Sequence, residues 1–594
     1  MKSDGRAQAP LPSVQRAVRH WKVRDPGEED TASLGEAASV PPLVARLLLN
    51  RGISSADDAK AWLHGSLRDL PDPRRMVDMD KTVARLVQAL EGGERICIHG
   101  DYDVDGCTST VLLVDFLRDL GGDVEWYAPH RERDGYGIQT ATMRRLAEGG
   151  ARVVVTCDNG TSAHEAIEAG NALGVDTLVC DHHTLPDALP SAFSILNPKR
   201  DGDGNPYMEM AAVGIAFMLA VAIRARLRES GFFAHRAEPD LRRYLDIVAL
   251  GTVADMAPLR GVNRLLVRSG LRVLERRERP GIRGLLEVSG IAADAPLEAS
   301  HLGFRLGPRI NAAGRMDESR RAVDLLLASD DQLARTTARD LDAFNRRRQE
   351  IQRDIFADVL RQAEREGDFH ERKGLVLWSE KWHPGVVGIV ASKVVRYFHR
   401  PALILALRDG VATGSGRAIS GIDLVGALRP YRHLMERFGG HRAAVGLTVR
   451  QENLSALRAA FAGEAFANDD DPDVWTARLS VDAEIPLSMA SWGTYEAIQR
   501  LGPFGMGNPE PVFAARGLRA TGVRALPKDG IRMQLAQSGV DALPAVGFGL
   551  GLLPEQIRGP LDVAFHLQEN RWRGRRTLEL HLRDVRASDP ESGP

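Results

Sequence analysis

Between residues 94 and 260, short apolar runs alternate with segments whose apolar residues recur at helical spacing. The runs are rich in Val and Ile, and each ends in polar residues; they span 94–100, 123–129, 152–158 and 176–181. Strands that alternate with helices in this way are typical of β-α-β units. The pattern therefore predicts a parallel sheet, followed by two further helices over 210–230 and 240–254.

The rest of the chain divides by the same kinds of pattern. A helical pattern without Gly or Pro covers 320–366 and predicts an extended connector helix. The last 120 residues alternate short strands with Gly and Pro, which predicts a small β-barrel or sandwich. The predicted parts are a poorly ordered lead-in (1–40), a helical N-terminal segment (41–90), the parallel-sheet α/β domain (91–319), the connector helix (320–370), a second α/β domain (371–465) and, after an acidic linker, the β-domain (475–590).

Composition excludes several classes of protein. The 594 residues are 43% hydrophobic and 27% charged, which is enough for several cores. Lys and Arg number 78 against 80 Asp and Glu, which excludes a uniformly basic nucleic-acid coat but not a local basic groove. The longest apolar run, 211–223, is too short to span a membrane. Without a signal-peptide core or a CxxC pair among the four cysteines, the expected location is the reducing cytoplasm.

Four polar clusters stand where apolar segments end. In an open parallel sheet, the carboxyl ends of the strands line the ligand crevice, so these clusters are expected to converge. Cys157 and Cys180 each precede a cluster, and we expect them to be small buried apolar residues. The clusters are His99-Gly-Asp101-Tyr-Asp103-Val-Asp105, Asp158-Asn159-Gly160, Asp181-His182-His183 and Asp255.

The chemistry of converging carboxylates is restrictive. Carboxylates that lie close together repel, and divalent cations remove that repulsion. Oxygen ligands with a few imidazoles suit Mn²⁺ or Mg²⁺, and two such ions that share a carboxylate are the usual arrangement for phosphoester hydrolysis. Each cluster alone has an ordinary explanation: Asp-Asn-Gly is a common turn, and the first cluster resembles a calcium loop without its terminal Glu. At successive strand ends, the four together favour a two-metal site.

The segments HGDYDVDG, TCDNG, DHH and VADMAPL, in this order, resemble the motifs of the DHH phosphoesterase superfamily, and most closely its RecJ family of exonucleases. The resemblance implies that Asp158 bridges two ions and that His183 faces the scissile phosphate. His183 would donate to a nonbridging oxygen or protonate the leaving group, and Asp101 and Asp181 would orient ligand imidazoles. It assigns one ion to His99, Asp103 and Asp158, and the other to Asp105, Asp158, His182 and Asp255; His99 is either a direct ligand or a hydrogen-bond donor.

Three Gly-rich segments, 382–394, 414–424 and 438–449, resemble the DHH-associated domain that holds nucleic acid in this family. Small residues, hydroxyls and Arg suit a close approach of the backbone to phosphate. The residues implied there are His383, Ser415, Arg417, Ser420, His441 and Arg442. A polar segment between the two α/β domains adds three candidate phosphate contacts, Arg309, Asn311 and Arg315.

The segment GPFGMGNPEPVF (502–513) resembles part of the C-terminal OB-fold domain of the same family. OB-folds bind single strands through basic grooves and stacked aromatic rings. Phe504, Phe513, Trp572 and Arg573 are present here, and the sequence leaves open whether each belongs to the groove or to the core.

The function that this resemblance implies is a 5′-to-3′ exonuclease for single-stranded DNA, which releases mononucleotides with Mn²⁺ or Mg²⁺ and acts in recombination and repair. Its partners would be single-stranded DNA with a 5′ end, a helicase and a single-strand-binding protein. No association with a membrane is expected. One alternative is a phosphodiesterase for oligonucleotides or cyclic dinucleotides. Another is a catalytically inactive DNA-binding scaffold, which the complete set of carboxylates disfavours.

Overall fold

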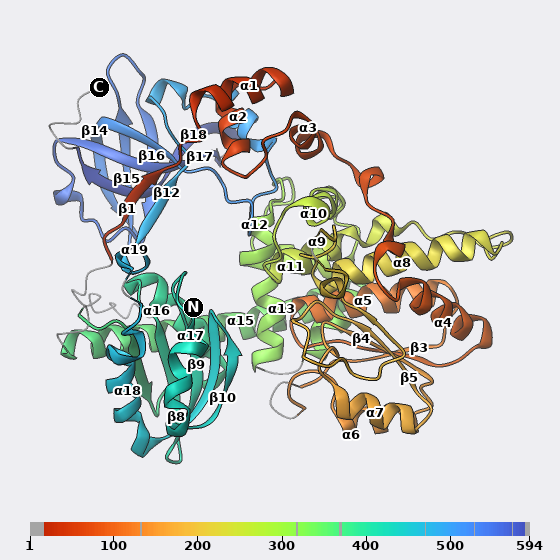
Figure 1. The fold of residues 1–594 in the computed structure, drawn as a ribbon. Helices are drawn as coiled ribbons and strands as arrows, with labels where there is room; N and C mark the ends of the chain where they lie inside the picture. Colours follow the sequence, from red (N-terminus) through yellow and green to blue (C-terminus); the bar gives the residue numbers. More distant parts are fainter. Residues whose placement is uncertain are drawn as a thin grey trace. The chain divides into compact units, whose positions relative to one another are not determined.

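The computed structural model describes residues 17–130, 134–202, 204–316, 319–366, 371–469, 471–527, 529–572 and 574–588. The chain forms two compact units, traced in Figure 1. One, here called the sheet unit, comprises residues 32–346 and 497–510. The other, here called the barrel unit, comprises the residues up to 31, 347–496 and those from 511 onward.

The core of the sheet unit is a five-stranded sheet in the order β3-β2-β4-β5-β6, and all of its strands are parallel. This confirms the predicted parallel sheet, and four of its strands lie where the apolar runs predict them. The fifth, β6, was not predicted because only three residues form it. The strands are β2 (Ile96–His99), β3 (Val124–Tyr127), β4 (Val153–Cys157), β5 (Asp176–Cys180) and β6 (Ser194–Leu196).

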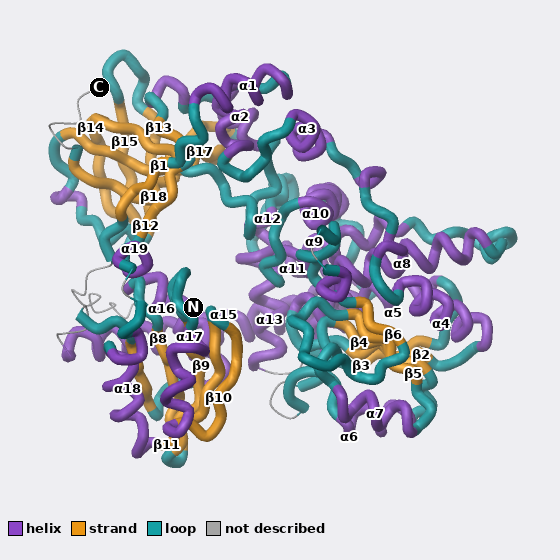
Figure 2. Tube along the Cα trace, in the orientation of Figure 1, coloured by secondary structure: helices purple, strands orange, loops and turns teal. Residues whose placement is uncertain are grey.

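Helices cover both faces of this sheet (Figure 2). Alternate strand residues point to opposite faces, so Ile96 and Ile98 meet the large core while Cys97 meets a smaller one. Helices α4 (Met79–Gly92), α5 (Val104–Asp119) and α8 (Ala212–Glu229) supply the large core. Helices α6 (Thr140–Glu148) and α7 (His164–Ala172) cover the other face.

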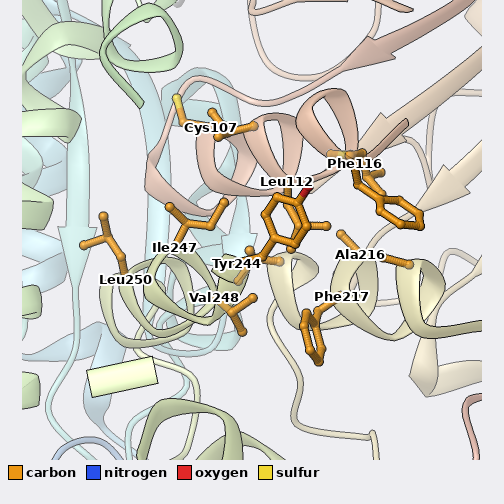
Figure 3. Packing of buried hydrophobic residues seen from close by; sticks show 14 of the residues in the cluster. Cys107, Leu112, Phe116, Ala216, Phe217, Tyr244, Ile247, Val248 and Leu250 are labelled. Carbon is orange, nitrogen blue, oxygen red and sulfur yellow. The ribbon is translucent and has the colours of Figure 1, made fainter. Parts of the chain in front are cut away.

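Helix α5 is apolar almost all round because it packs between the sheet, α8 and α9 (Leu245–Ala254). Figure 3 shows Leu112 and Phe116 of α5 facing Ala216 and Tyr244. This packing fixes the first turn of α5, the first turn of α8 and the last turn of α9 in one rigid core. The remaining elements of the unit are α2 (Pro42–Leu49), α3 (Ala56–His64), α10 (Gly261–Leu274), α11 (Pro280–Val288), α12 (Ala299–His301), the π-helix η5 (Leu302–Leu306), α13 (Gly307–Met316) and α14 (Arg320–Leu327).

The barrel unit contains a second sheet and a closed barrel. The second sheet has the order β10-β11-β9-β8-β7, and only β7 and β8 are parallel. The barrel closes where β14 pairs with β17, as the OB-fold prediction requires. Its elements are β7 (Leu375–Ser379), α16 (Pro384–Phe398), β8 (Ala402–Arg408), β9 (Val411–Arg417), α17 (Leu424–Leu428), β10 (Met435–His441), β11 (Ala444–Arg450), α18 (Leu454–Ala462), β12 (Arg478–Val481), β13 (Ala483–Glu484), α20 (Trp492–Gln499), β14 (Phe513–Leu526), β15 (Gly530–Ala536), β16 (Leu543–Phe548), β17 (Pro560–Trp572) and β18 (Arg575–Ala587).

The prediction of a poorly ordered lead-in is wrong for part of residues 1–40. β1 (His20–Val23) pairs in parallel with β12, and α1 (Glu28–Ala38) follows it. Trp21 packs on the same small core as Val481, and its Nε1 donates to Asp584 at 2.7 Å. The partners of this strand come from the far end of the sequence, so local composition could not reveal it. Residues 1–16 lie outside the described part of the chain.

The single connector helix predicted over 320–370 is in fact two helices. α14 ends at Leu327, and α15 (Asp331–Glu366) starts after a short break in which the Asp330 carboxylate accepts the Leu333 amide at 2.7 Å. Apolar residues early in α15, such as Leu341, belong to the core of the sheet unit, whereas Val359 and Leu360 belong to the core of the barrel unit. Of the described residues, none lies in a helix that is long and apolar enough to cross a membrane.

Candidate metal centre

The predicted polar clusters meet at the carboxyl ends of the strands. Asp103 is the N-cap of α5, where its carboxylate accepts the amides of Asp105 and Gly106 at 2.9 and 3.1 Å. Asp158 and Asp181 directly follow β4 and β5, and Asp255 caps the C-terminus of α9. Seven predicted residues fall into three groups whose possible ligand atoms lie within 4.8 Å of one another. The groups are Asp101, Asp103 and Asp158; Asp158, His182 and His183; and Asp105, His182 and Asp255.

Asp158 belongs to two of these groups, which places it at the middle of the centre. Its backbone is left-handed, with φ of 64°, and Asp tolerates this conformation better than most residues. Its amide donates to the Cys180 carbonyl at 3.0 Å, and its Oδ1 lies 3.1 Å from His182 Nε2. Burial raises its pKa well above the usual range, and the neighbouring carboxylates of Asp103 and Asp105 raise it further.

Asp105 and Asp255 also carry carboxylates that resist ionisation. Burial, and then the charge of Asp255, raises the pKa of Asp105 to about 7. Burial and the charge of Asp103 likewise raise the pKa of Asp255 to about 7. Asp105 nevertheless keeps a fixed direction, because the amides of Ala212 and Val213 in the first turn of α8 donate to it at 2.7 and 2.9 Å.

The third cluster is held by hydrogen bonds to Asp181. Its Oδ1 accepts the amide of His182 at 2.8 Å and lies 2.8 Å from Nδ1 of His183. Burial acts to raise the pKa of Asp181, but the bonds from His183 and Thr161 outweigh burial and lower it. The His183 ring remains 44% exposed, and although burial opposes its charged form, Asp181 raises its pKa. His183 is therefore the imidazole of this centre that a substrate can reach.

His99 lies apart from the three groups. Its ring is fully buried and stacks on Tyr127 with the ring centroids 5.5 Å apart. Within the described part of the chain, neither ring nitrogen has a hydrogen-bond partner. Burial lowers the pKa of His99 to about 4, so the ring is neutral and can offer a lone pair. A buried imidazole without a partner is costly, and an ion or a bound water would remove that cost.

Three residues of the centre were not predicted. The Tyr136 hydroxyl lies 3.2 Å from both the Asp158 carbonyl oxygen and His183 Nδ1. Lys199 donates through Nζ to the His182 carbonyl, and Asn197 donates to the His183 carbonyl at 2.9 Å. Lys199 and Asn197 follow β6, the strand that the sequence pattern missed. Tyr136 lies in a Gly-rich turn, and no apolar strand precedes it to mark its place.

The residues present fit divalent cations. Several carboxylates share a buried space, and the pKa of three of them is raised by burial and by the negative charge of their neighbours. His182 Nε2 lies 3.1 Å and His183 Nδ1 lies 3.8 Å from the Asp158 Oδ1 among them. Such a set of oxygens with a few imidazoles is suited to Mn²⁺ or Mg²⁺, which would offset the repulsion.

Gly106 allows the Asp101–Asp105 loop to close on α5. A Cβ at this position would lie 2.4 Å from the backbone nitrogen of Asp101, which cannot yield as a flexible side chain could. We expect Gly106→Ala to weaken Mn²⁺ binding measured by calorimetry and to cost about 2–3 kcal/mol in free energy of unfolding. Gly92→Ala is the control, since its nearest neighbour is the Glu94 side chain at 3.6 Å. Equal Mn²⁺ affinity in the two variants would contradict this role of Gly106.

Arg309, a predicted phosphate contact, is held by protein groups in the structure. Its guanidinium is only 13% exposed and lies 2.9 Å from the Asp342 carboxylate. It also donates to the carbonyl oxygens of Arg305 and Val288 at 2.6 and 3.2 Å. Arg309 therefore ties α13 to α15. Asn311 is partly buried on α13, and the side chain of Arg315 lies outside the described part of the chain.

We expect Arg309→Ala to lower stability rather than DNA affinity. The change leaves the Asp342 carboxylate, which is 6% exposed, with Arg346 as its remaining ion-pair partner. The loss in free energy of unfolding should be about 1–3 kcal/mol, measured by urea denaturation. A large rise in the KM for single-stranded DNA at unchanged stability would instead support the phosphate contact.

The predicted residues of the DHH-associated domain lie on the second sheet and its neighbouring helix. His383 caps α16, where its Nδ1 accepts the Gly385 amide at 3.1 Å. A Cβ on Gly388 of that helix would lie 3.1 Å from Ser415 Oγ and 3.7 Å from the Arg417 guanidinium, so α16 approaches β9 closely at these two residues.

The other predicted residues cluster at the end of β9. Arg417 pairs with Ala444 in the register of β9 and β11. Exposed Arg442 lies in the turn from β10 to β11, 3.9 Å from the Asp423 carboxylate. Ser420 and His441 are exposed nearby in sequence, which makes this sheet end a surface of small polar and basic groups.

The residues named in the C-terminal segment lie in different parts of the structure. Phe513 is buried against Phe565, with ring centroids 6.1 Å apart, so it is a core residue. Phe504 belongs to the sheet unit instead of the barrel. The side chain of Trp572 and all of Arg573 lie outside the described residues.

Three family models match the chain: the DHH family N-terminal domain over residues 95–252, the DHHA1 domain over 371–466 and the RecJ OB domain over 481–584. Single-stranded-DNA-specific exonuclease RecJ of Dickeya dadantii is 40% identical over 91% of this chain and 95% of that protein. The protein of the same name from Escherichia coli is 36% identical over 94% and 97% of the two chains. The crystal structure of RecJ from Thermus thermophilus in complex with Mn²⁺ covers 96% of this chain and 80% of its own, with a TM-score of 0.80 and 30% identity. The same protein with Mg²⁺ gives a TM-score of 0.74 at 29% identity.

Proposed function

Since this chain belongs to the RecJ family of single-stranded-DNA-specific exonucleases, we propose that it degrades its strand from the 5′ end and releases mononucleotides. The chain is a hydrolase of the DHH class that acts on single-stranded DNA with divalent ions, Mn²⁺ or Mg²⁺. Its centre supports this best through one observation, the position of the buried Asp158 carboxylate in two adjoining groups of possible ligands.

We assign the metal ligands from the resemblance and the geometry together. One ion would be held by His99, Asp103 and Asp158, and the other by Asp105, Asp158, His182 and Asp255. When bound, the two ions neutralise charge on the phosphoryl oxygens and lower the pKa of the attacking water. No ligand of this set is exposed as fully as His183, which leaves His183 for the substrate.

The protein residues around the ions perform the positioning. Asp181 fixes the His183 ring through Nδ1, so the other nitrogen, Nε2, can donate to a nonbridging phosphate oxygen or to the leaving oxygen. The Tyr136 hydroxyl lies within 3.3 Å of both ring nitrogens and limits the rotation of the ring. The amides at the start of α8 hold Asp105 in a single direction. The centre is therefore preorganised before a strand arrives.

We assign the binding of single-stranded DNA to the DHH-associated domain and the barrel. His383, Ser415, Arg417, Ser420, His441 and Arg442 supply hydroxyl, imidazole and guanidinium donors for phosphate groups. The proposed setting is DNA recombination and repair in the cytoplasm, where a helicase and a single-strand-binding protein would present the strand. Co-purification of tagged chain with either protein from cells tests this part.

The decisive experiment uses single-stranded DNA labelled at one end, with the 5′ or the 3′ end blocked in separate substrates. Mononucleotides should appear with Mn²⁺ or Mg²⁺, and only the 5′ block should prevent their release. If long strands stay intact while dinucleotides or cyclic dinucleotides are cleaved, the phosphodiesterase alternative replaces the proposal. If the strand binds but no bond breaks with either ion, the alternative of a catalytically inactive scaffold replaces the proposal.

A further inference from the structure

A loop from the C-terminal part of the chain folds into the sheet unit. Residues 497–510 belong to that unit, although the residues on both sides of them belong to the barrel unit. The whole segment 502–513 falls within the stretch that matches the RecJ OB domain, as predicted, and residues 502–510 of it pack in the sheet unit. The residues of this loop that carry the contacts, 500–509, are here called the GN loop after its Gly-Asn pair, Gly507 and Asn508.

Arg264 of α10 fastens the GN loop. Its side chain is 1% exposed, and its partners in the described chain are backbone carbonyl oxygens and an aromatic ring instead of a carboxylate. It donates to Trp62 at 2.6 Å and to Gly502 at 2.6 Å, with further bonds to Arg500 and Leu501 at 3.3 Å. The guanidinium also lies over the Trp62 ring, 4.5 Å from its centroid. A buried cation held in this way joins α3, α10 and the GN loop rigidly.

Asn508 fixes the conformation of the GN loop through hydrogen bonds to other residues of the loop. It is fully buried, and its Nδ2 donates to the carbonyl oxygens of Leu501 and Pro503 at 3.0 and 2.8 Å. Its Oδ1 accepts from Arg51 Nε at 2.8 Å. The amide thus uses both its donors and its acceptor, so the loop has one conformation that satisfies it.

The GN loop lies against the segment 256–260, which joins α9 to α10. The Leu259 amide donates to the Met506 carbonyl at 2.7 Å, and Arg260 Nε donates to the Gly507 carbonyl at 2.8 Å. A Cβ on Gly505 would lie 2.7 Å from the Leu259 side chain, and one on Gly507 would lie 2.8 Å from Pro258. Gly507 is therefore needed for this close approach, because its neighbour is a rigid proline and its φ is +70°, whereas a side chain at Gly505 would displace the end of Leu259.

Segment 256–260 directly follows Asp255, which we assign as a metal ligand. Asp255 ends α9, and the helix is terminated by Met256 in a left-handed conformation with φ of 61°. The Ala257 amide turns back to the Thr252 carbonyl at 3.2 Å. Asn263 Nδ2 donates to the Pro258 carbonyl at 3.0 Å, and the contacts with the GN loop hold Leu259 and Arg260, which follow Asp255 closely in sequence.

We propose that Arg264 and the GN loop position Asp255 for the ion that it shares with Asp105 and His182. Arg264 is thus a positioning residue for catalysis, and residues far along the chain complete the metal centre. This inference rests on the proposed function for its metal assignment.

The test measures Mn²⁺ binding by calorimetry without DNA in a double-mutant cycle of Arg264→Lys and Asp255→Asn. Lysine keeps the charge but loses the planar fork, so Arg264→Lys should weaken Mn²⁺ binding at one site about tenfold. In the Asp255→Asn background the same change should have no further effect on affinity. The KM for single-stranded DNA should stay constant, and saturating Mn²⁺ should restore kcat.

Arg272→Met on the exposed face of α10 is the control, and it should match the unaltered protein throughout. Asn508→Ala provides a second route to the same result if Arg264→Lys does not fold, as judged by circular dichroism. Equal losses of affinity with Asp255 present and absent, or a lower melting temperature with unchanged Mn²⁺ affinity, would overturn the proposal. Since the cycle involves no DNA, it is decided separately from the exonuclease assay.

Discussion

Asp158→Asn should abolish exonuclease activity while the metal-free protein becomes more stable. Asp158 belongs to two groups of possible metal ligands, and the amide that replaces its carboxylate cannot bridge two cations as a charged group does. We expect kcat on single-stranded DNA to fall by about a thousandfold or more, since a lost bridging ligand affects both ions. Measurement of kcat at saturating Mn²⁺ checks this, because weak binding alone would then be overcome.

The expected gain in stability has a separate cause. Burial and the charges of Asp103 and Asp105 raise the pKa of Asp158, which means that its ionised form is disfavoured in the fold. Asparagine removes that charge, and it also tolerates the left-handed backbone at this position, with φ of 64°. In EDTA the melting temperature of Asp158→Asn should therefore exceed that of the unaltered protein. A variant that loses activity and melts at a lower temperature would point to a disrupted fold instead of a missing ligand.

Removal of metal should abolish activity and reverse the dependence of stability on pH. The pKa of Asp105 and of Asp255 rises to about 7 in the metal-free fold, above the ordinary value near 3.8. Between these values the folded chain binds more protons than the unfolded chain, so the free energy of unfolding falls as pH rises. The full destabilisation is reached above about pH 7, and it should amount to several kcal/mol, since one pKa unit corresponds to about 1.4 kcal/mol.

Mn²⁺ should reverse this slope, because it binds the ionised carboxylates and releases their protons. Melting temperatures between pH 5 and 8.5, with EDTA and with Mn²⁺, give both curves. The double variant Asp105→Asn and Asp255→Asn should flatten the EDTA curve. A free energy of unfolding that rises with pH in EDTA would show that the two carboxylates are ionised without an ion.

The sequence predicted the parts of the centre that lie next to strands. Apolar runs marked β2, β4 and β5, and the residues after them, from Asp101 to His183, meet as the strand-end rule requires. Asp255, the fourth cluster, follows an apolar helix instead of a strand. Lys199 and Asn197 were not predicted, because β6, the strand before them, has only three residues and shows no recognisable apolar pattern.

Contacts between distant parts of the chain could not be predicted from local patterns. β1 pairs with a strand more than 400 residues away, and the bonds of Arg264 reach across more than 200. An Arg in an amphipathic helix is ordinarily a solvated residue, and nothing near Arg264 in sequence indicates a buried one. Gly505 and Gly507 lie in the segment that resembles the OB-fold domain, and nothing near them in sequence indicates their close approach to Leu259 and Pro258.

The discontinuity of the sheet unit has a consequence for biosynthesis. The ribosome makes the segment up to Arg346 long before it reaches Ala497, where the last part of that unit begins. With roughly 150 residues between them and translation at about 5–20 residues per second, the nascent sheet unit waits on the order of ten seconds or longer for the GN loop. Until then the segment that follows Asp255 lacks its partner from the GN loop. A nuclease assembled in this order completes its metal centre only when most of its own chain has been translated.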